Sequence, residues 1–97
     1  MSTTVASASI TAQNTFTDPV QLEGYFNLSI SGTWAATVTV QRSIDNNAWV
    51  DVDSFTANTE EYGFEPELMW YRVGVKTGAF TSGTVVVRLG REYKDRH

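Results

Sequence analysis

Acidic side chains are the residues of this chain best suited to do chemistry, and they gather in its middle. Carboxylates without any lysine or arginine among them occupy positions 45–67: Asp45, Asp51, Asp53, Glu60, Glu61, Glu65 and Glu67. Most glycosidases use a pair of carboxylates as their catalytic groups, and Asp51 and Asp53 would lie about 7 Å apart on one face of a strand. Exposed like charges at that spacing are ordinary on a solvated strand, so we expect no catalytic pair here.

Nucleophilic catalysis and metal binding have even less support. The single histidine is His97, and there is no cysteine, so a serine or threonine nucleophile would lack its usual base. Asp45 and Asn47 offer the hard oxygen ligands that calcium prefers. The surrounding loop lacks the dense set of acidic residues typical of such sites. We therefore expect a protein without enzymatic activity, cofactor or bound metal.

Composition also narrows the class of partner. The net charge of −4 argues against general nucleic-acid binding, which needs a basic face to displace counterions. No apolar run approaches the roughly 20 residues of a membrane-spanning helix, so we expect no membrane partner. Small extracellular β domains often depend on disulfides. The lack of cysteine therefore favours assembly in the cytoplasm.

The elements that carry these residues are β-strands. Apolar and polar residues alternate in five runs: 26–31, 36–41, 50–53, 71–76 and 85–89. Because strand side chains point to opposite faces in turn, each run has one apolar and one polar face, and such strands must pack face to face. We expect a single all-β domain over residues 1–97, an antiparallel β-sandwich of Ig-like or jelly-roll-like type with about seven strands.

Turn residues divide the runs. Ser31-Gly32-Thr33 predicts a short hairpin, with the glycine available for positive φ. Asp45-Asn46-Asn47 predicts a second hairpin, because Asp and Asn tolerate left-handed backbone and bond to their own main chain. Residues 1–17, rich in small side chains, are interpreted as an N-terminal arm or strand, and residues 91–97 as a basic tail.

The tryptophans have different expected roles. Trp34 and Trp49 are predicted to pack in the core or at its rim. Trp70 lies on the polar phase of its strand, next but one to Arg72, so we expect it to be exposed. Exposed aromatic residues anchor protein interfaces or stack on sugar rings, which makes Trp70 the preferred aromatic candidate for an interface.

The stretch from Phe26 to Arg91 resembles small all-β virion proteins of tailed bacteriophages. The residues that carry this resemblance are Ser31-Gly32-Thr33-Trp34, Val38-Thr39-Val40-Gln41-Arg42-Ser43, Trp49-Val50-Asp51-Val52, Phe55-Thr56-Ala57-Asn58-Thr59-Glu60, Tyr71-Arg72-Val73-Gly74 and Thr81-Ser82-Gly83-Thr84-Val85. The resemblance implies a non-enzymatic structural protein of the virion, assembled in the host cytoplasm. A capsid decoration or cement protein that stabilises the assembled head is the preferred type.

Such a protein would contact the major capsid protein or another virion protein, and we expect it to form a homo-oligomer on the particle. The contacts are predicted on the N-terminal arm, the exposed strand positions and the basic tail: Thr3, Val5, Ser7, Ser9, Thr11, Trp70, Arg72, Arg88, Arg91, Tyr93, Lys94 and Arg96. The alternative is a carbohydrate-binding or tail-fibre-associated β-sandwich module, which requires a planar or concave aromatic platform that includes Trp70.

Overall fold

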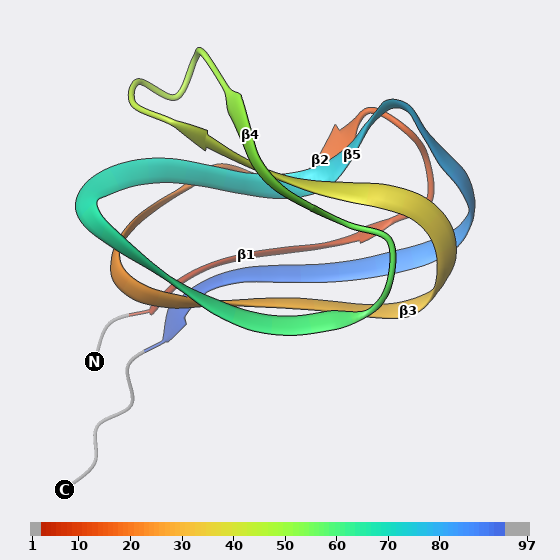
Figure 1. Cartoon of the computed structure of the whole chain (residues 1–97), viewed down its shortest axis with the longest axis horizontal. Coiled ribbons are helices and arrows are strands. Elements are labelled where there is room, and N and C mark those ends of the chain that lie inside the picture. The colour runs from red at the N-terminus through yellow and green to blue at the C-terminus, as the bar shows by residue number, and fades with distance from the viewer. Residues whose placement is uncertain (1–2, 93–97) are drawn as a thin grey trace, which may run out of the picture.

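The chain folds as an antiparallel β-sheet. A computed structural model describes the backbone of residues 3–92 and the side chains of residues 5–91. Within this part the elements are β1 (Thr3–Ile10), β2 (Thr15–Phe16), β3 (Val20–Ser43), β4 (Val50–Phe55) and β5 (Thr59–Glu92), as Figure 1 shows. No helix occurs among the described residues. The predicted all-β class is therefore confirmed.

Two long, bent strands organise the sheet. Its strand order is β1-β5-β3-β4, with β2 paired to β5, and every pair is antiparallel. One part of β3, Asn27–Ile30, lies between two separate stretches of β5, residues 59–62 and 87–90. A later part of β3, residues 38–43, pairs with residues 70–75 of β5. The sheet consequently curls over on itself (Figure 1). A sandwich of about seven strands is not confirmed, because bends within β3 and β5 replace several of the expected strand ends.

The prediction of a hairpin at Ser31–Thr33 is wrong. Strand β3 runs through these residues, and Gly32 and Trp34 pair with Val85 and Gly83 of β5. Gly32 has φ +101° and Gly83 has φ +92°, a conformation that L residues with a Cβ rarely adopt. These glycines thus permit β3 and β5 to bend together at this point. The sequence pattern had indicated a reversal of the chain instead.

The hairpin predicted at Asp45–Asn47 is confirmed. Strands β3 and β4 form an antiparallel pair on either side of it, and Asn46 has φ +61°. The Asp45 carboxylate accepts hydrogen bonds from the backbone N–H groups of Asn47 (2.9 Å) and Ala48 (3.0 Å). These bonds satisfy donors that a tight loop would otherwise expose.

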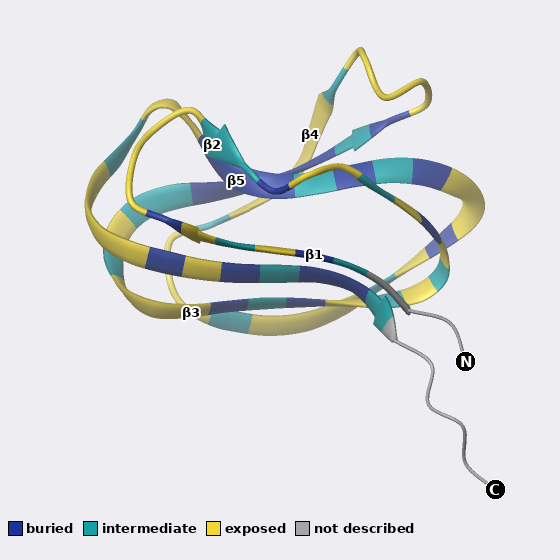
Figure 2. Ribbon diagram, turned by 180° about the vertical axis from the view of Figure 1, so that it is seen from behind, coloured by how far each residue is buried: buried dark blue, intermediate teal, exposed yellow. Residues whose placement is uncertain are grey.

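The core lies inside the curl, and β1, β3 and β5 all contribute to it. Val38, Val73 and Val87 are fully buried, as is Ile10 of β1. Along β3 and β5, buried and exposed positions alternate in the banded pattern visible in Figure 2. Residues 3–10 are therefore an integral strand of the sheet rather than an appended arm.

Candidate interaction surface

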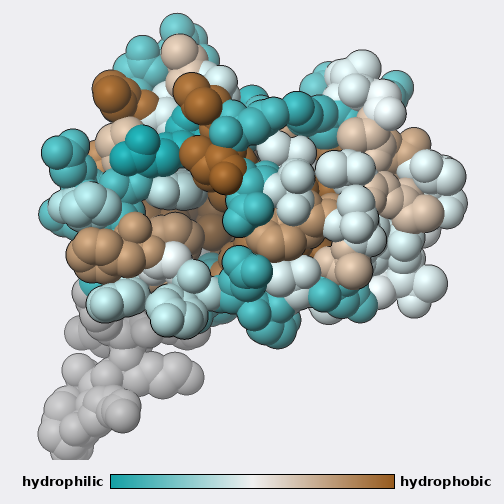
Figure 3. Space-filling view, in the orientation of Figure 1, coloured by the Kyte–Doolittle hydropathy of each residue, from teal (hydrophilic) through white to brown (hydrophobic). Residues whose placement is uncertain are grey.

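Exposed apolar side chains gather around β4 and the loop before it. Ile44 is 80% exposed, Val50 64% and Val52 48%. Figure 3 shows strongly hydrophobic side chains grouped on the face that carries β4. Large apolar side chains clustered on a surface, unlike scattered ones, mark sites of interaction. We call Ile44, Val50 and Val52 the β4 patch.

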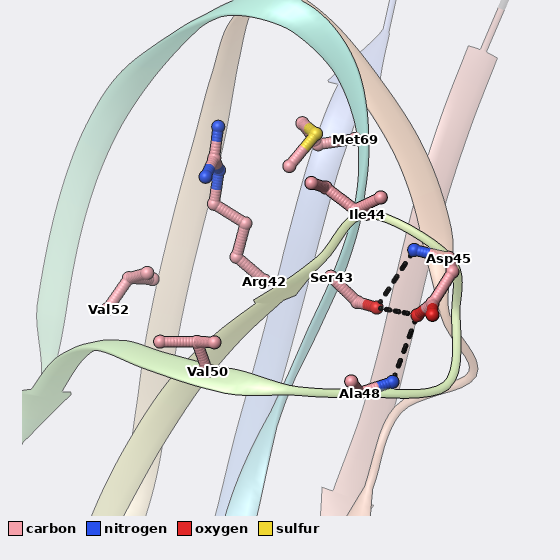
Figure 4. Close-up of a pocket in the computed structure, with 8 residues that line it drawn as sticks. All are labelled: Arg42, Ser43, Ile44, Asp45, Ala48, Val50, Val52 and Met69. Carbon is pink, nitrogen blue, oxygen red and sulfur yellow. Dashed lines mark hydrogen bonds between the residues drawn. The ribbon is translucent and has the colours of Figure 1, made fainter.

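A cavity of about 410 Å³ opens beside the β4 patch. Its lining is shown in Figure 4 and consists of Arg42, Ser43, Ile44, Asp45, Ala48, Val50, Val52 and Met69. Most of these side chains are apolar, and the Asp45 carboxylate is already held by the hairpin backbone. The cavity is therefore suited to receive an apolar group and offers no free nucleophile or base.

Arg42, which lines this cavity, forms an ion pair with the buried Glu65 of β5. Glu65 is only 2% exposed, and its carboxylate accepts hydrogen bonds from Arg42 Nε (2.7 Å) and Nη2 (2.9 Å) and from the Tyr71 hydroxyl (2.7 Å). The bond from Arg42 is the largest cause that lowers the pKa of Glu65. Burial, followed by the Glu65 hydrogen bond, raises the pKa of Tyr71 to about 12. Glu65 is thus ionised and fully engaged, which fits a structural role.

A second cluster of exposed side chains is aromatic. Tyr25, Tyr62 and Phe64 are 66%, 74% and 58% exposed. The Tyr25 ring lies 4.9 Å from Phe64 and 6.1 Å from Tyr62, centroid to centroid, and the rings are tilted by about 50°. Their backbones pair across β3 and β5, where Tyr25 lies opposite Phe64 and Asn27 lies opposite Tyr62. We call these three residues the aromatic cluster.

The β4 patch and the aromatic cluster form one continuous surface. A second cavity, of about 200 Å³, is lined by Val52 of the patch and by Tyr62 and Phe64 of the cluster. Asp53 and Glu61 line the same cavity. Arg42 is the single lysine or arginine in the described lining of either cavity, and it is bound to Glu65. The combined surface is therefore apolar with acidic borders.

Sequence reasoning missed the aromatic cluster. Trp70, the aromatic residue it favoured, is half-buried. Tyr25 continues the polar phase of the 26–31 alternation, and Tyr62 and Phe64 are two positions apart, which is the spacing of one strand face. This two-residue spacing is the signal in the sequence that could have identified the aromatic cluster. Which strands lie side by side depends on long-range register and is not visible in the sequence.

Some of the predicted contact residues lie together on the outer side of β1. Ser7 and Ser9 are exposed and Val5 is half-buried, and Ser7 pairs with Arg88 of β5. Thr11 follows β1 and is exposed. The backbone of Thr3 pairs with Glu92 at the end of β1.

The remaining predicted contacts lie elsewhere. Arg72 is stacked between Phe16 and Trp49, with its guanidinium carbon 4.4 Å from both ring centroids, and burial lowers its pKa. This placement makes Arg72 part of the packing. Arg91 donates to the Glu23 carbonyl. The other predicted contacts, Tyr93, Lys94 and Arg96, lie outside the described residues.

The acidic pair considered for catalysis is partly occupied. Asp51 accepts hydrogen bonds from Lys76 (2.5 Å) and Gln41 (2.8 Å), and these two bonds, the first being larger, lower its pKa. Across the described part of the chain, no group of three or more His, Cys, Asp or Glu side chains is arranged to hold a metal ion. Within residues 3–92 there is also no helix of the length and apolar character needed to cross a bilayer.

Comparison of the chain with protein-family models, with curated proteins and with solved structures finds no match.

Proposed function

We propose that this chain is a non-enzymatic structural protein of a tailed-phage virion, of the capsid decoration or cement type. The observation that carries the proposal is the continuous surface formed by the β4 patch and the aromatic cluster, because apolar surface of this kind is typical of a protein interface. The resemblance of residues 26–91 to small all-β virion proteins supports the same function. For the fold we propose a β-sandwich in which β3 and β5 each bend to serve both layers.

The chemistry of the surface defines the partner. Apolar side chains at its centre call for an apolar counterpart, and Asp53 and Glu61 at its border favour lysine or arginine around that counterpart. The proposed partner is therefore a virion protein, the major capsid protein first, that exposes apolar residues flanked by basic ones. A domain that binds the assembled shell and not its separated subunits stabilises the shell by mass action. Many copies on one particle add avidity.

Substitution of the β4 patch tests this proposal. In Val50→Lys/Val52→Lys, both lysines replace exposed side chains, so the domain is expected to fold while the apolar interface is lost. Incorporation into particles, counted by quantitative mass spectrometry of purified virions, is expected to fall about tenfold or more, equivalent to at least about 1.4 kcal/mol of binding free energy. The control Thr77→Lys/Thr81→Lys adds the same charge at exposed positions outside the surface and is expected to incorporate normally. Normal incorporation of the β4 variant would contradict the proposal.

The aromatic cluster favours a second candidate, a carbohydrate-binding or tail-fibre-associated module. Tyrosine and phenylalanine rings stack on sugar faces, and the two hydroxyls add hydrogen-bonding capacity. This candidate predicts glycan-array binding that is lost in Tyr62→Ala/Phe64→Ala and retained in Trp70→Ala. Incorporation into particles without any glycan binding would favour the decoration protein, and glycan binding without incorporation would favour the module.

A further inference from the structure

One edge of the sheet is long, regular and uncharged. Strand β1 pairs with β5 through eight consecutive residues, from Thr3 opposite Glu92 to Ile10 opposite Val85, without a register shift. On its other side β1 has no strand neighbour within the described part of the chain. Its sequence, TTVASASI, contains no charged residue and no proline. Unpaired backbone groups along such an edge are a template for another strand.

The other edges carry the features that normally discourage strand pairing. Strand β4 has Asp51 and Asp53, and its register with β3 shifts between Val40 and Gln41. The first stretch of β5, which pairs with β3 on one side, has Glu60 and Glu61 and is followed by Pro66. Strand β2 has only two residues. Charge, bulges, proline and shortness all protect edges, and β1 has none of them.

The charges on the edge strands favour a second copy of β1 as the strand that pairs with the β1 edge. If β4 paired with a copy of itself, aspartates would face aspartates, which destabilises a sheet. A copy of β1 brings no charge to the contact. The closest basic residue on the outer face, Arg88, lies one strand further in, so the two copies of Arg88 would be about 14 Å apart, or three strand spacings. That distance exceeds the physiological Debye length of about 8 Å.

We propose that the free edge of β1 pairs antiparallel with β1 of a second copy of this chain, giving a two-fold symmetric dimer with one continuous sheet. In this pairing the exposed faces of the two β1 strands must lie on the same side of the joined sheet. A register shift of one residue would instead place the exposed side chains of one strand on the buried side. Ser7 is exposed on that face. The register that overlaps residues 4–10 places Ser7 opposite its own copy, with no large side chain in between. This proposal does not depend on virion function, because it concerns the purified chain alone.

The mass of the full chain in solution tests the pairing. Sedimentation velocity across a dilution series is expected to show twice the mass of one chain. In Ser7→Lys/Ser9→Lys, like charges meet across the two-fold axis, and the dissociation constant is expected to rise about tenfold or more. The matched variant Ser54→Lys/Thr56→Lys places the same charge at exposed positions in and after β4, and it is expected to stay dimeric. Circular dichroism checks that both variants fold.

A crosslink tests the register. The chain has no cysteine, so Ser7→Cys introduces a single thiol, and strands that meet at this position bring the two Cβ atoms into disulfide range. Mild oxidation is expected to give a covalent dimer with Ser7→Cys and not with Ser54→Cys. A wild-type monomer at all concentrations, a dimer unaffected by the β1 lysines, or crosslinking only at position 54 would overturn the proposal. So would an open-ended series of masses broken by either lysine variant, which would indicate head-to-tail pairing of β1 with β4.

Discussion

At the scale of single residues, the Glu65 carboxylate is held by hydrogen bonds from Arg42, Tyr71 and the backbone N–H of Glu67. It is buried while ionised and depends on Arg42, whose side chain is 37% exposed. Arg42→Met leaves a buried carboxylate without its countercharge. We expect the free energy of unfolding, measured by urea denaturation, to fall by about 3 kcal/mol, the low end for a broken buried pair because Arg42 is partly solvated.

The double variant Arg42→Met/Glu65→Leu separates charge from packing. Replacing both partners removes the buried charge along with its countercharge, and such replacements are often close to neutral. We expect it to recover most of the stability lost in Arg42→Met. A single variant as stable as wild type would show that the ion pair contributes nothing.

The same carboxylate makes a pH-dependent contribution. Its pKa is lowered from the ordinary 4.5 by the Arg42 hydrogen bond. Between the lowered folded-state pKa and 4.5 the unfolded chain binds more protons, so stability rises with pH in that window. We expect thermal stability to be lost as pH falls from about 4.5. In Glu65→Gln that acid dependence is expected to be shallower, and equal slopes in both proteins would contradict the assignment.

At the scale of elements, the bends of β3 and β5 decide the architecture. Gly83 has positive φ, and a Cβ there would meet the backbone of Thr33 and Trp34 at sub-contact distance. Gly78 has nearly the same φ, +83°, with no atom within 4 Å of its would-be Cβ. A residue with a Cβ would therefore have similar backbone strain at both positions, but it would clash with neighbouring atoms only at position 83.

Alanine substitutions exploit that difference. Strain at positive φ costs about 1 kcal/mol for a single left-handed residue, and we expect this cost alone in Gly78→Ala. Gly83→Ala adds a backbone clash, so we expect a loss of about 3 kcal/mol, combining strain with displacement of a paired strand. Chemical denaturation of both variants measures the difference. Equal losses would show that the bend at Gly83 is not tightly packed.

Sequence patterns predicted strands better than their connections. Alternation at 26–31 and 85–89 correctly located inward residues such as Leu28 and Val87, because that period follows from local geometry. The reversal predicted at Gly32 was wrong because positive φ suits a bend as well as a turn. The Asp45 hairpin was predictable because its bonds are local.

The candidate surface was less accessible from sequence. The acidic stretch that borders it is visible in the sequence. The aromatic cluster is not, since Tyr25 and Phe64 meet only through long-range register. The phase of its strand predicts an exposed Trp70, whereas the structure has it half-buried. Exposure in a curled sheet depends on which strands close over one another, and that information is not local.

At the scale of the whole molecule, the strand order β1-β5-β3-β4 has two chemically different strands at its ends. The β4 edge is apolar and acidic, and the β1 edge is neutral and small. A molecule that pairs with itself through β1 would present two copies of the β4 patch, and two linked sites bind a repetitive shell more strongly than one. The proposed dimer would therefore strengthen the proposed binding to the shell, although each of the two proposals can hold without the other.

The most direct test of the central proposal is a cryo-electron microscopy reconstruction of the assembled particle that contains this chain. We expect copies on the outside of the head, with Val50 and Val52 against the shell and basic residues of the shell protein near Asp53 and Glu61. Absence of the chain from the head, or copies whose β4 patch faces solvent while another face contacts the shell, would contradict it.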